Sequence, residues 1–216
     1  MTKGVIWDMD GVLADTAQFH YRAWKKVFGD MGIDFSWEDF THSFGTRNDR
    51  IIPKVLGRKC TKEEIVSIDD KKEYLFREFA KGKVKPLDGL VDLLRSLRED
   101  GFKMAVASSG TPENVEAIIG QCKLKSFFSV IINGSEVQHG KPNPEVFLLA
   151  GKKLGAEVRK CIVVEDALAG IEGAKKAGMK CIAITSTHKK DSLKDADLII
   201  DSFRNLSPND FNKLIE

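Results

Sequence analysis

The sequence lacks long apolar runs, paired cysteines and an excess of charge of either sign. It holds no stretch of about 18 consecutive apolar residues, the length that a membrane span needs, and acidic residues begin at Asp8, which argues against a signal peptide. With 34 basic and 32 acidic residues, the formal net charge of +2 gives no field that favours nucleic acid or a membrane surface. The four cysteines are far apart and form no CxxC pair, as is typical of free thiols in a reducing compartment: Cys60, Cys122, Cys161 and Cys181. We therefore expect a cytoplasmic protein with neither nucleic acid nor a membrane as a partner.

Short apolar runs of strand length recur along the chain: GVIWD, KMAVASS, FSVIIN, CIVVED, KCIAIT and DLII. From residue 88 onward, helical patterns separate most of these runs. Such alternation is typical of a mainly parallel sheet with helices on both faces. With 216 residues and 42% apolar content, the chain can build one such core and a small second domain. The prediction is a Rossmann-like α/β fold.

Residues 16 to 82 break this rhythm. The stretch TAQFHYRAWKKVFGDMG has apolar residues at helical spacing, and further helical segments follow with no convincing strand. Pro86 and nearby glycines interrupt the helical pattern on the far side. The sequence therefore predicts a helical cap domain, residues 16–82, inserted into a core domain made of residues 1–15 and 83–216.

The segment WDMDGVLADT places Asp8, Asp10 and Asp15 directly after the first apolar run. Side chains at i and i+2 share one side of an extended chain, and Gly11 allows a sharp turn that aims Asp8 and Asp10 at one point. Ligands of open α/β sheets bind beyond the carboxyl ends of the strands, where this pair would supply a nucleophile and an acid/base partner. Turns are also commonly rich in Asp and Gly, so the motif alone fits an ordinary turn as well. We expect Asp15 to help fix that turn.

Two later segments carry groups that bind anions. KMAVASSG ends a predicted strand in Ser108 and Ser109, whose hydroxyls would donate to phosphate oxygens where a helix begins at about Pro112. Either serine would equally serve as the N-cap of that helix. Lys141, in GKPNPE, lies between a predicted strand and a predicted helix. We expect this lysine to neutralise a carboxylate and a phosphoryl group together.

A further pair of carboxylates, Glu165 and Asp166, ends the predicted strand CIVVED. With Asp8 and one oxygen of Asp10 they form a set of hard oxygen ligands, which Mg²⁺ prefers. The set has no thiol and no histidine, which argues against zinc. Without a cation these carboxylates would repel one another, and some would take up protons. The sequence therefore predicts a magnesium site.

With these four elements in order, the chain resembles the haloacid dehalogenase superfamily, and within it the capped subgroup that contains β-phosphoglucomutase and related sugar-phosphate phosphatases. The resemblance covers nearly the whole chain. It implies that Asp8 forms an aspartyl-phosphate and that Asp10 transfers protons and gives its backbone carbonyl to magnesium. It also implies that Ser108 and Lys141 hold the transferring phosphoryl group. Whether Glu165 binds the metal or only orients the site stays open.

The cap carries candidates of its own. The segment HYRAW, residues 20 to 24, resembles the mutase branch of the superfamily, which implies that His20 couples Asp10 to closure of the cap. As a lone histidine it would otherwise serve packing or hydrogen bonding only. Trp24, one helical turn further on, would contact the substrate or fill the cap interface.

Two basic residues of the cap are further candidates. A loose alignment makes Arg47 in FGTRND and Lys71 in DDKKEY substrate contacts, and Arg47 would clamp an anionic group through two hydrogen bonds. Arg50 or Lys72 would be their replacements. Most basic side chains on helices are simply solvated, which is the alternative for all of these.

The stretch Gly110-Thr111-Pro112 departs from the mutases, which carry a Ser-Lys/Arg-Asn type segment there that helps to grip a second phosphate. We therefore expect a phosphatase of a small phosphorylated sugar or related metabolite, with β-phosphoglucomutase as the alternative. A phospho-aspartate signalling domain is a remote third, because such domains lack both an inserted cap and an acid two residues after the acceptor. We expect a monomer or a weak oligomer.

Overall fold

The computed structural model describes residues 2–216, and it confirms the α/β prediction. Its sheet consists of six parallel strands in the order β3-β2-β1-β4-β5-β6. The strands are β1 (Gly4–Trp7), β2 (Lys103–Ala107), β3 (Val130–Ile132), β4 (Cys161–Glu165), β5 (Lys180–Ile184) and β6 (Leu198–Ile200). Each lies within one of the predicted apolar runs. The chain therefore builds the sheet outward from β1 on one side, then returns to place β4 on the other.

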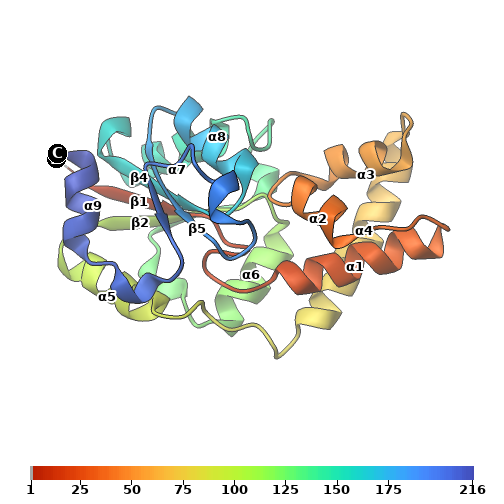
Figure 1. The fold of residues 1–216 in the computed structure, drawn as a ribbon, viewed down its shortest axis with the longest axis horizontal. Helices are drawn as coiled ribbons and strands as arrows, with labels where there is room; N and C mark the ends of the chain where they lie inside the picture. The colour runs from red at the N-terminus through yellow and green to blue at the C-terminus, as the bar shows by residue number, and fades with distance from the viewer. Residues whose placement is uncertain (1) are drawn as a thin grey trace.

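Helices cover both faces of this sheet (Figure 1). One face packs against α5 (Leu90–Glu99), α6 (Pro112–Gln121) and α9 (Pro208–Ile215), and the other against α7 (Glu145–Leu154) and α8 (Leu168–Lys176). Val5 and Trp7 of β1 belong to the first apolar cluster and Ile6 to the second. The strands are apolar throughout because successive side chains enter opposite clusters, both of which are buried.

Short 3₁₀ helices occupy several of the connections between these elements. They are η1 (Lys125–Phe127), η2 (Gly134–Glu136), η3 (Val158–Lys160), η4 (Lys190–Ser192) and η5 (Phe203–Asn205). Within residues 2–216, no helix is long and apolar enough to cross a membrane.

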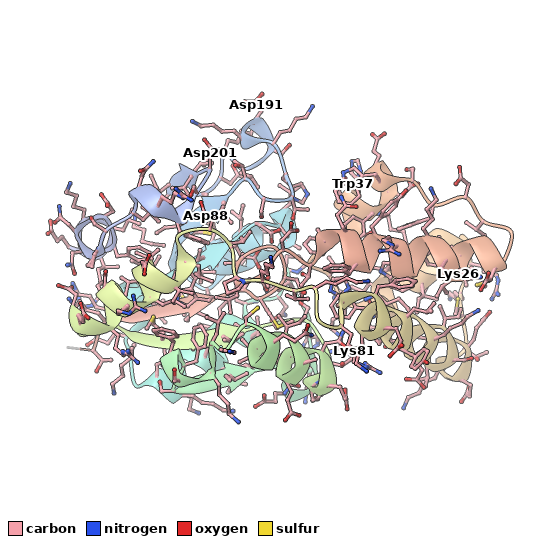
Figure 2. The ribbon with its side chains drawn as sticks, turned by 90° about the horizontal axis from the view of Figure 1, so that it is seen from below. Lys26, Trp37, Lys81, Asp88, Asp191 and Asp201 are labelled. Carbon is pink, nitrogen blue, oxygen red and sulfur yellow. The ribbon has the colours of Figure 1, made fainter. Side chains whose placement is uncertain are left out.

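Four helices follow β1 before the chain reaches α5: α1 (Ala17–Asp30), α2 (Trp37–Ser43), α3 (Asn48–Leu56) and α4 (Lys62–Ala80). They gather at one end of the molecule, beside the sheet and its helices (Figure 1). We call them the cap helices. Seen from below, Lys26 and Trp37 lie on this group, whereas Asp88, Asp191 and Asp201 lie on the body around the sheet (Figure 2).

The cap helices have an apolar cluster of their own, in which the rings of Trp24 and Phe28 stack with centroids 4.9 Å apart. The two segments that connect the cap helices to the rest of the chain lie side by side, because Ala14 in the first forms a β-bridge with Pro86 in the second. Next to this bridge, the N–H of Leu87 donates to the carbonyl of residue 13 at 3.2 Å. The separate cluster and the paired passages support the predicted division into residues 16–82 and the remainder, which stays a prediction.

Candidate active site

Three carboxylates lie close together at the carboxyl ends of β1 and β4, the two neighbouring strands between which the strand order of the sheet reverses. Asp8 directly follows β1, and Glu165 and Asp166 lie at the end of the neighbouring strand β4. The N–H of Asp8 donates to the carbonyl of Val164 at 2.9 Å, which fixes the two strand ends against each other. One oxygen from each carboxylate lies within 4.8 Å of the others, and all three residues are buried. This is the position at which open α/β sheets bind ligands.

The turn after Asp8 depends on Gly11. This residue has φ +78°, and a Cβ on it would lie 2.0 Å from Oδ2 of Asp166. That oxygen accepts the hydroxyl of Thr187 at 2.5 Å, while the hydroxyl of Ser186 donates to the carbonyl of Gly11 at 2.5 Å. Glycine thus supplies both the backbone conformation and the space that bring the turn against Asp166.

Lys141 joins two of the three carboxylates. Its ammonium forms ion pairs with Oδ1 of Asp8 and, at 2.6 Å, with Oε1 of Glu165, and its side chain is 1% exposed. The second oxygen of Glu165 accepts two backbone N–H groups at 2.9 Å each. Both oxygens of Glu165 therefore have protein donors, which favours orientation of Lys141 over metal binding as its role. Gly170 leaves room for this carboxylate, because a Cβ there would lie 1.8 Å from Oε1.

The acidic cluster carries more negative charge than Lys141 balances. Burial, together with the charges of Glu165 and Asp10, raises the pKa of Asp8 to about 8 against the opposing charge of Lys141. Burial, together with Glu165 and Asp8, also raises the pKa of Asp166 well above its usual value. The pKa of Lys141 is raised, because the attraction of Asp8 and Glu165 outweighs the effect of burial.

The same cluster fits a divalent cation. In the described part of the chain, Oδ1 of Asp166 is buried without a hydrogen-bond partner. A cation beside it would satisfy this oxygen and would favour the charged forms of Asp8 and Asp166. Carboxylate oxygens with no sulfur or nitrogen ligand match the preference of magnesium. The residues present are therefore compatible with a magnesium ion held by Asp8 and Asp166.

The side chain of Asp10 lies apart from this cluster and belongs to a different network. Its Oδ1 accepts the hydroxyl of Thr16 at 2.6 Å and contacts Nε2 of His20 at 3.0 Å. Nδ1 of His20 lies 2.8 Å from the ammonium of Lys72. Because an ammonium only donates, Nδ1 accepts and Nε2 carries the proton that it donates to Asp10. Asp15, which we expected to help fix the turn, is exposed. The side chain that donates to Asp10 is that of the next residue, Thr16.

This network keeps Asp10 charged. Burial would raise the pKa of Asp10, but the electrostatic attraction and hydrogen bond of the His20 N–H and the hydrogen bond of the Thr16 hydroxyl together lower it below its usual value. The predicted metal contact of Asp10 therefore rests on its backbone carbonyl rather than on its carboxylate.

A buried polar cluster ties helix α4 of the cap to helix α6. Glu73 accepts hydrogen bonds from Lys72 at 2.7 Å, from Asn48 at 2.6 Å and, across the interface, from Asn114 at 2.5 Å. Arg77 of the same helix donates to the amide oxygen of Asn114 at 3.0 Å. The sequence did not predict the contact between Glu73 and Asn114, because a polar residue in a helical pattern does not indicate a partner 41 positions away.

A pocket of about 250 Å³ lies between the cap helices and the strand ends. Of the predicted site residues, those that line it are Asp8, Asp10, His20, Trp24, Arg47 and Ser109. Ser108 and Lys141 are buried at 1% exposure and are not among its lining residues. The structure thus brings six of the predicted residues to one pocket, which both the cap helices and the loops at the strand ends line.

Lys71, one of the predicted substrate contacts, does not line the pocket. Its side chain is exposed and pairs with Asp30 at 2.9 Å, away from the lining of the pocket. Lys72 lines the pocket instead, because neighbouring residues of a helix point about 100° apart and only one of them faces inward. Arg50 is exposed and does not line the pocket either.

The two serines are not the cap of α6, the alternative that the sequence left open. Thr111 caps this helix, since its hydroxyl accepts the N–H of Asn114 at 3.3 Å. The hydroxyl of Ser108 accepts the N–H of Gly110 at 3.0 Å. Ser109 donates to the carbonyl of Gly45 at 3.1 Å and so joins the loop after β2 to the cap.

Residues 5–184 match the haloacid dehalogenase-like hydrolase family. The chain belongs to this family. The resemblance expected from the sequence motifs is thereby confirmed.

Named relatives of the chain include both a phosphatase and a mutase. The chloroplastic protein SUPPRESSOR OF QUENCHING 1 of Arabidopsis thaliana is 35% identical over 96% of this chain, which spans 20% of that longer protein. The fructose-1-phosphate phosphatase YqaB of Escherichia coli K12 is 29% identical over 84% of this chain and 95% of its own length. A crystal structure of β-phosphoglucomutase from Clostridium difficile has a TM-score of 0.90 at 26% identity, covering 100% of this chain and 97% of that one. The shared fold is therefore compatible with either activity.

We expect Glu73→Gln to lower the free energy of unfolding by about 1–3 kcal/mol at pH 7, because a buried ion pair loses one partner. Burial raises the pKa of Glu73, but Lys72, His20 and Asn114 together lower it from 4.5 to about 2. Since the folded-state pKa is depressed, the charge of Glu73 stabilises the protein above about pH 4.5, and this contribution is lost as the pH falls toward 2. Urea unfolding should therefore show a difference between the two proteins at pH 7 that shrinks below pH 4.5. Glu78→Gln, at an exposed position of the same helix, is the control, and a difference independent of pH would contradict this account.

Proposed function

We propose that the protein is a magnesium-dependent phosphatase that hydrolyses a small phosphorylated sugar or related metabolite through an aspartyl-phosphate on Asp8. One observation carries the proposal: Asp8 and Asp10 line the same pocket but have different partners. Asp8 pairs with Lys141 in the acidic cluster, whereas Asp10 is held by Thr16 and His20. Two carboxylates in different surroundings suit a nucleophile and an acid/base catalyst. A cytoplasmic location and a monomeric or weakly oligomeric state stay predictions.

In the first half of the reaction, a carboxylate oxygen of Asp8 attacks phosphorus and the bond from phosphorus to the sugar oxygen breaks. Asp10 gives a proton to the departing oxygen, since the approach of an anionic phosphate favours the protonated form of this carboxyl. Lys141 stays charged beside Asp8 and offsets the negative charge that gathers there. The loop that carries Ser108 and Ser109 before α6 supplies donors for the phosphoryl oxygens. When bound by Asp8 and Asp166, magnesium would offset the negative charge of the transferring group.

In the second half, Asp10 takes a proton from a water molecule that attacks the aspartyl-phosphate, and phosphate leaves. His20 keeps Asp10 in position, and Lys72 fixes the tautomer of His20. His20 and Lys72 come from cap helices, so Asp10 has these partners only while the cap lies against the strand ends. Cap closure would then exclude bulk water and complete the acid/base group in one movement.

A β-phosphoglucomutase is the second candidate. The contact of Asp10 with His20 and the similarity to the Clostridium difficile enzyme favour it. Such a mutase has to hold a sugar bisphosphate while its two phosphates exchange roles. Gly110, Thr111 and Pro112 line the pocket without a charged donor. This supports hydrolysis over transfer to a second sugar oxygen.

Asp8→Asn should abolish the release of phosphate from phosphate monoesters, because an amide does not form the aspartyl-phosphate. Turnover with a panel of sugar monophosphates and magnesium measures this. Asp15→Asn, an exposed position in the same motif, should turn over like the wild-type protein. Undiminished phosphate release by Asp8→Asn would rule out the mechanism.

Removal of divalent metal should stop turnover, and added Mg²⁺ should restore it. Asp166→Asn should raise the Mg²⁺ concentration that gives half-maximal activity by roughly tenfold or more, because the unpartnered oxygen of Asp166 is a proposed ligand. Asp191→Asn, on the surface of the body around the sheet (Figure 2), is the matched control. Full activity of the metal-free wild-type protein would contradict the magnesium assignment.

Phosphatase and mutase are separated by incubation with β-glucose 1-phosphate and a trace of glucose 1,6-bisphosphate. The phosphatase proposal expects free phosphate to form faster than glucose 6-phosphate. Both products are measured in the same samples. Faster formation of glucose 6-phosphate would make the mutase the better assignment.

A further inference from the structure

Both basic side chains that line the pocket within the described residues already have anionic partners. The guanidinium of Arg47 lies 3.1 Å from Asp49 and donates to backbone carbonyls of residues 137 and 138 at 3.3 and 3.5 Å. The ammonium of Lys72, whose side chain is 3% exposed, lies 2.7 Å from Glu73 and 2.8 Å from Nδ1 of His20. Each cation is therefore already paired with a carboxylate.

Asp69 adds a further negative charge to this part of the pocket. Its Oδ1 accepts the amide of Asn48 at 2.6 Å, and the same amide donates to Glu73 at 2.6 Å. No hydrogen bond from residues 2–216 reaches the other carboxylate oxygen of Asp69. This side chain lines the pocket and so offers a hydrogen-bond acceptor there. We call the lining residues contributed by α3, α4 and the residue before α3 the cap end of the pocket.

The lining from the sheet side brings no compensating charge opposite the cap end. The stretches 110–112 and 134–135 consist of Gly, Thr, Pro and Ser, and all five residues line the pocket. The hydroxyl of Thr111 accepts the N–H of Asn114, and that of Ser135 donates to Asn133 at 2.6 Å, so these stretches bring no charged donor to the pocket. A second phosphate or a carboxylate on the substrate would therefore meet acids without a free cation.

We propose that the cap end selects phosphate esters in which the transferring phosphate is the only anionic group, and that Asp69 accepts a hydrogen bond from a hydroxyl at the other end of the substrate. The inference rests on the proposed phosphatase activity and narrows its substrate class. A neutral polyol end would satisfy the free oxygen of Asp69. A second anion would meet the negative charge of Asp69 and would find Arg47 and Lys72 already paired with carboxylates, which discriminates against it.

The test compares esters that differ at the far end. One pair is fructose 1-phosphate and fructose 1,6-bisphosphate, and the other is glucose 6-phosphate and 6-phosphogluconate, which replaces the aldehyde carbon by a carboxylate. For the wild-type protein with Mg²⁺, we expect kcat/KM to be at least about tenfold higher for the singly anionic member of each pair. Equal or reversed preference in both pairs would overturn the inference.

Two isosteric variants assign the selection to particular residues. Asp69→Asn should lower kcat/KM for the neutral-ended ester by roughly tenfold, mainly through KM, and change the value for the bisphosphate far less. Asp49→Asn removes the carboxylate that pairs with Arg47, so it should raise the ratio of kcat/KM for the bisphosphate to kcat/KM for the monophosphate. Asp70→Asn, at an exposed position next to Asp69, should retain the wild-type ratio.

The outcomes separate this inference from the proposed function. Equal losses for both kinds of ester in Asp69→Asn would overturn the role of Asp69, since a merely structural residue affects all substrates alike. Phosphate release without a preference for singly anionic esters would overturn the inference and leave the phosphatase activity standing. Failure of the wild-type protein to release phosphate from every ester would overturn both.

Discussion

The burial of the Lys141 ammonium between two carboxylates is the constraint on which the site depends. Charges are buried in proteins only when they are paired and hydrogen-bonded, and here the pairs link the end of β1, through Asp8, to the end of β4, through Glu165. Two glycines make this approach geometrically feasible. Gly11 lets the turn after Asp8 press against Asp166, and Gly170 leaves the volume that the carboxylate of Glu165 fills. The apolar strands β1 and β4 thereby end in a buried polar cluster that contains Asp8, Glu165 and Asp166.

The acid/base group follows a second constraint, which the cap imposes. Asp10 is two residues from Asp8, yet its partners include His20 and, behind it, Lys72, both from cap helices. Lys72 in turn depends on Glu73, which is fixed to the other side of the interface by Asn114. The surroundings of Asp10 are therefore assembled by the meeting of cap and sheet, whereas those of Asp8 are complete within the sheet and its loops. The surroundings of Asp10 therefore depend on the position of the cap helices more than those of Asp8 do.

Much of this was accessible from the sequence, for a physical reason. Strands buried on both faces are apolar throughout, and groups at the ends of neighbouring parallel strands meet at one edge of the sheet. Local patterns therefore predicted the sheet and the positions of Asp8, Ser108 and Glu165. The sequence did not determine which side of a cap helix faces the pocket. Neighbouring residues of a helix point about 100° apart, so an alignment that was off by one residue predicted Lys71 where Lys72 lines the pocket. Partners across the interface left no local signal at all. Asn114 and Glu73 are ordinary polar residues until the two helices pack together.

Charge along the pocket also explains how a phosphate ester would be oriented in it. The pocket lining holds more acids than bases, since Asp8, Asp10, Asp49, Asp69 and Glu73 face only Arg47 and Lys72. Positive potential for a phosphate then comes from the N-terminus of α6, from Lys141 behind Asp8 and from a cation at the acidic cluster. All three lie at the strand ends. The pocket is thus polarised along its length, with its anion-binding groups at the sheet and paired or negative groups at the cap, so the phosphate end of a substrate is favoured only beside Asp8.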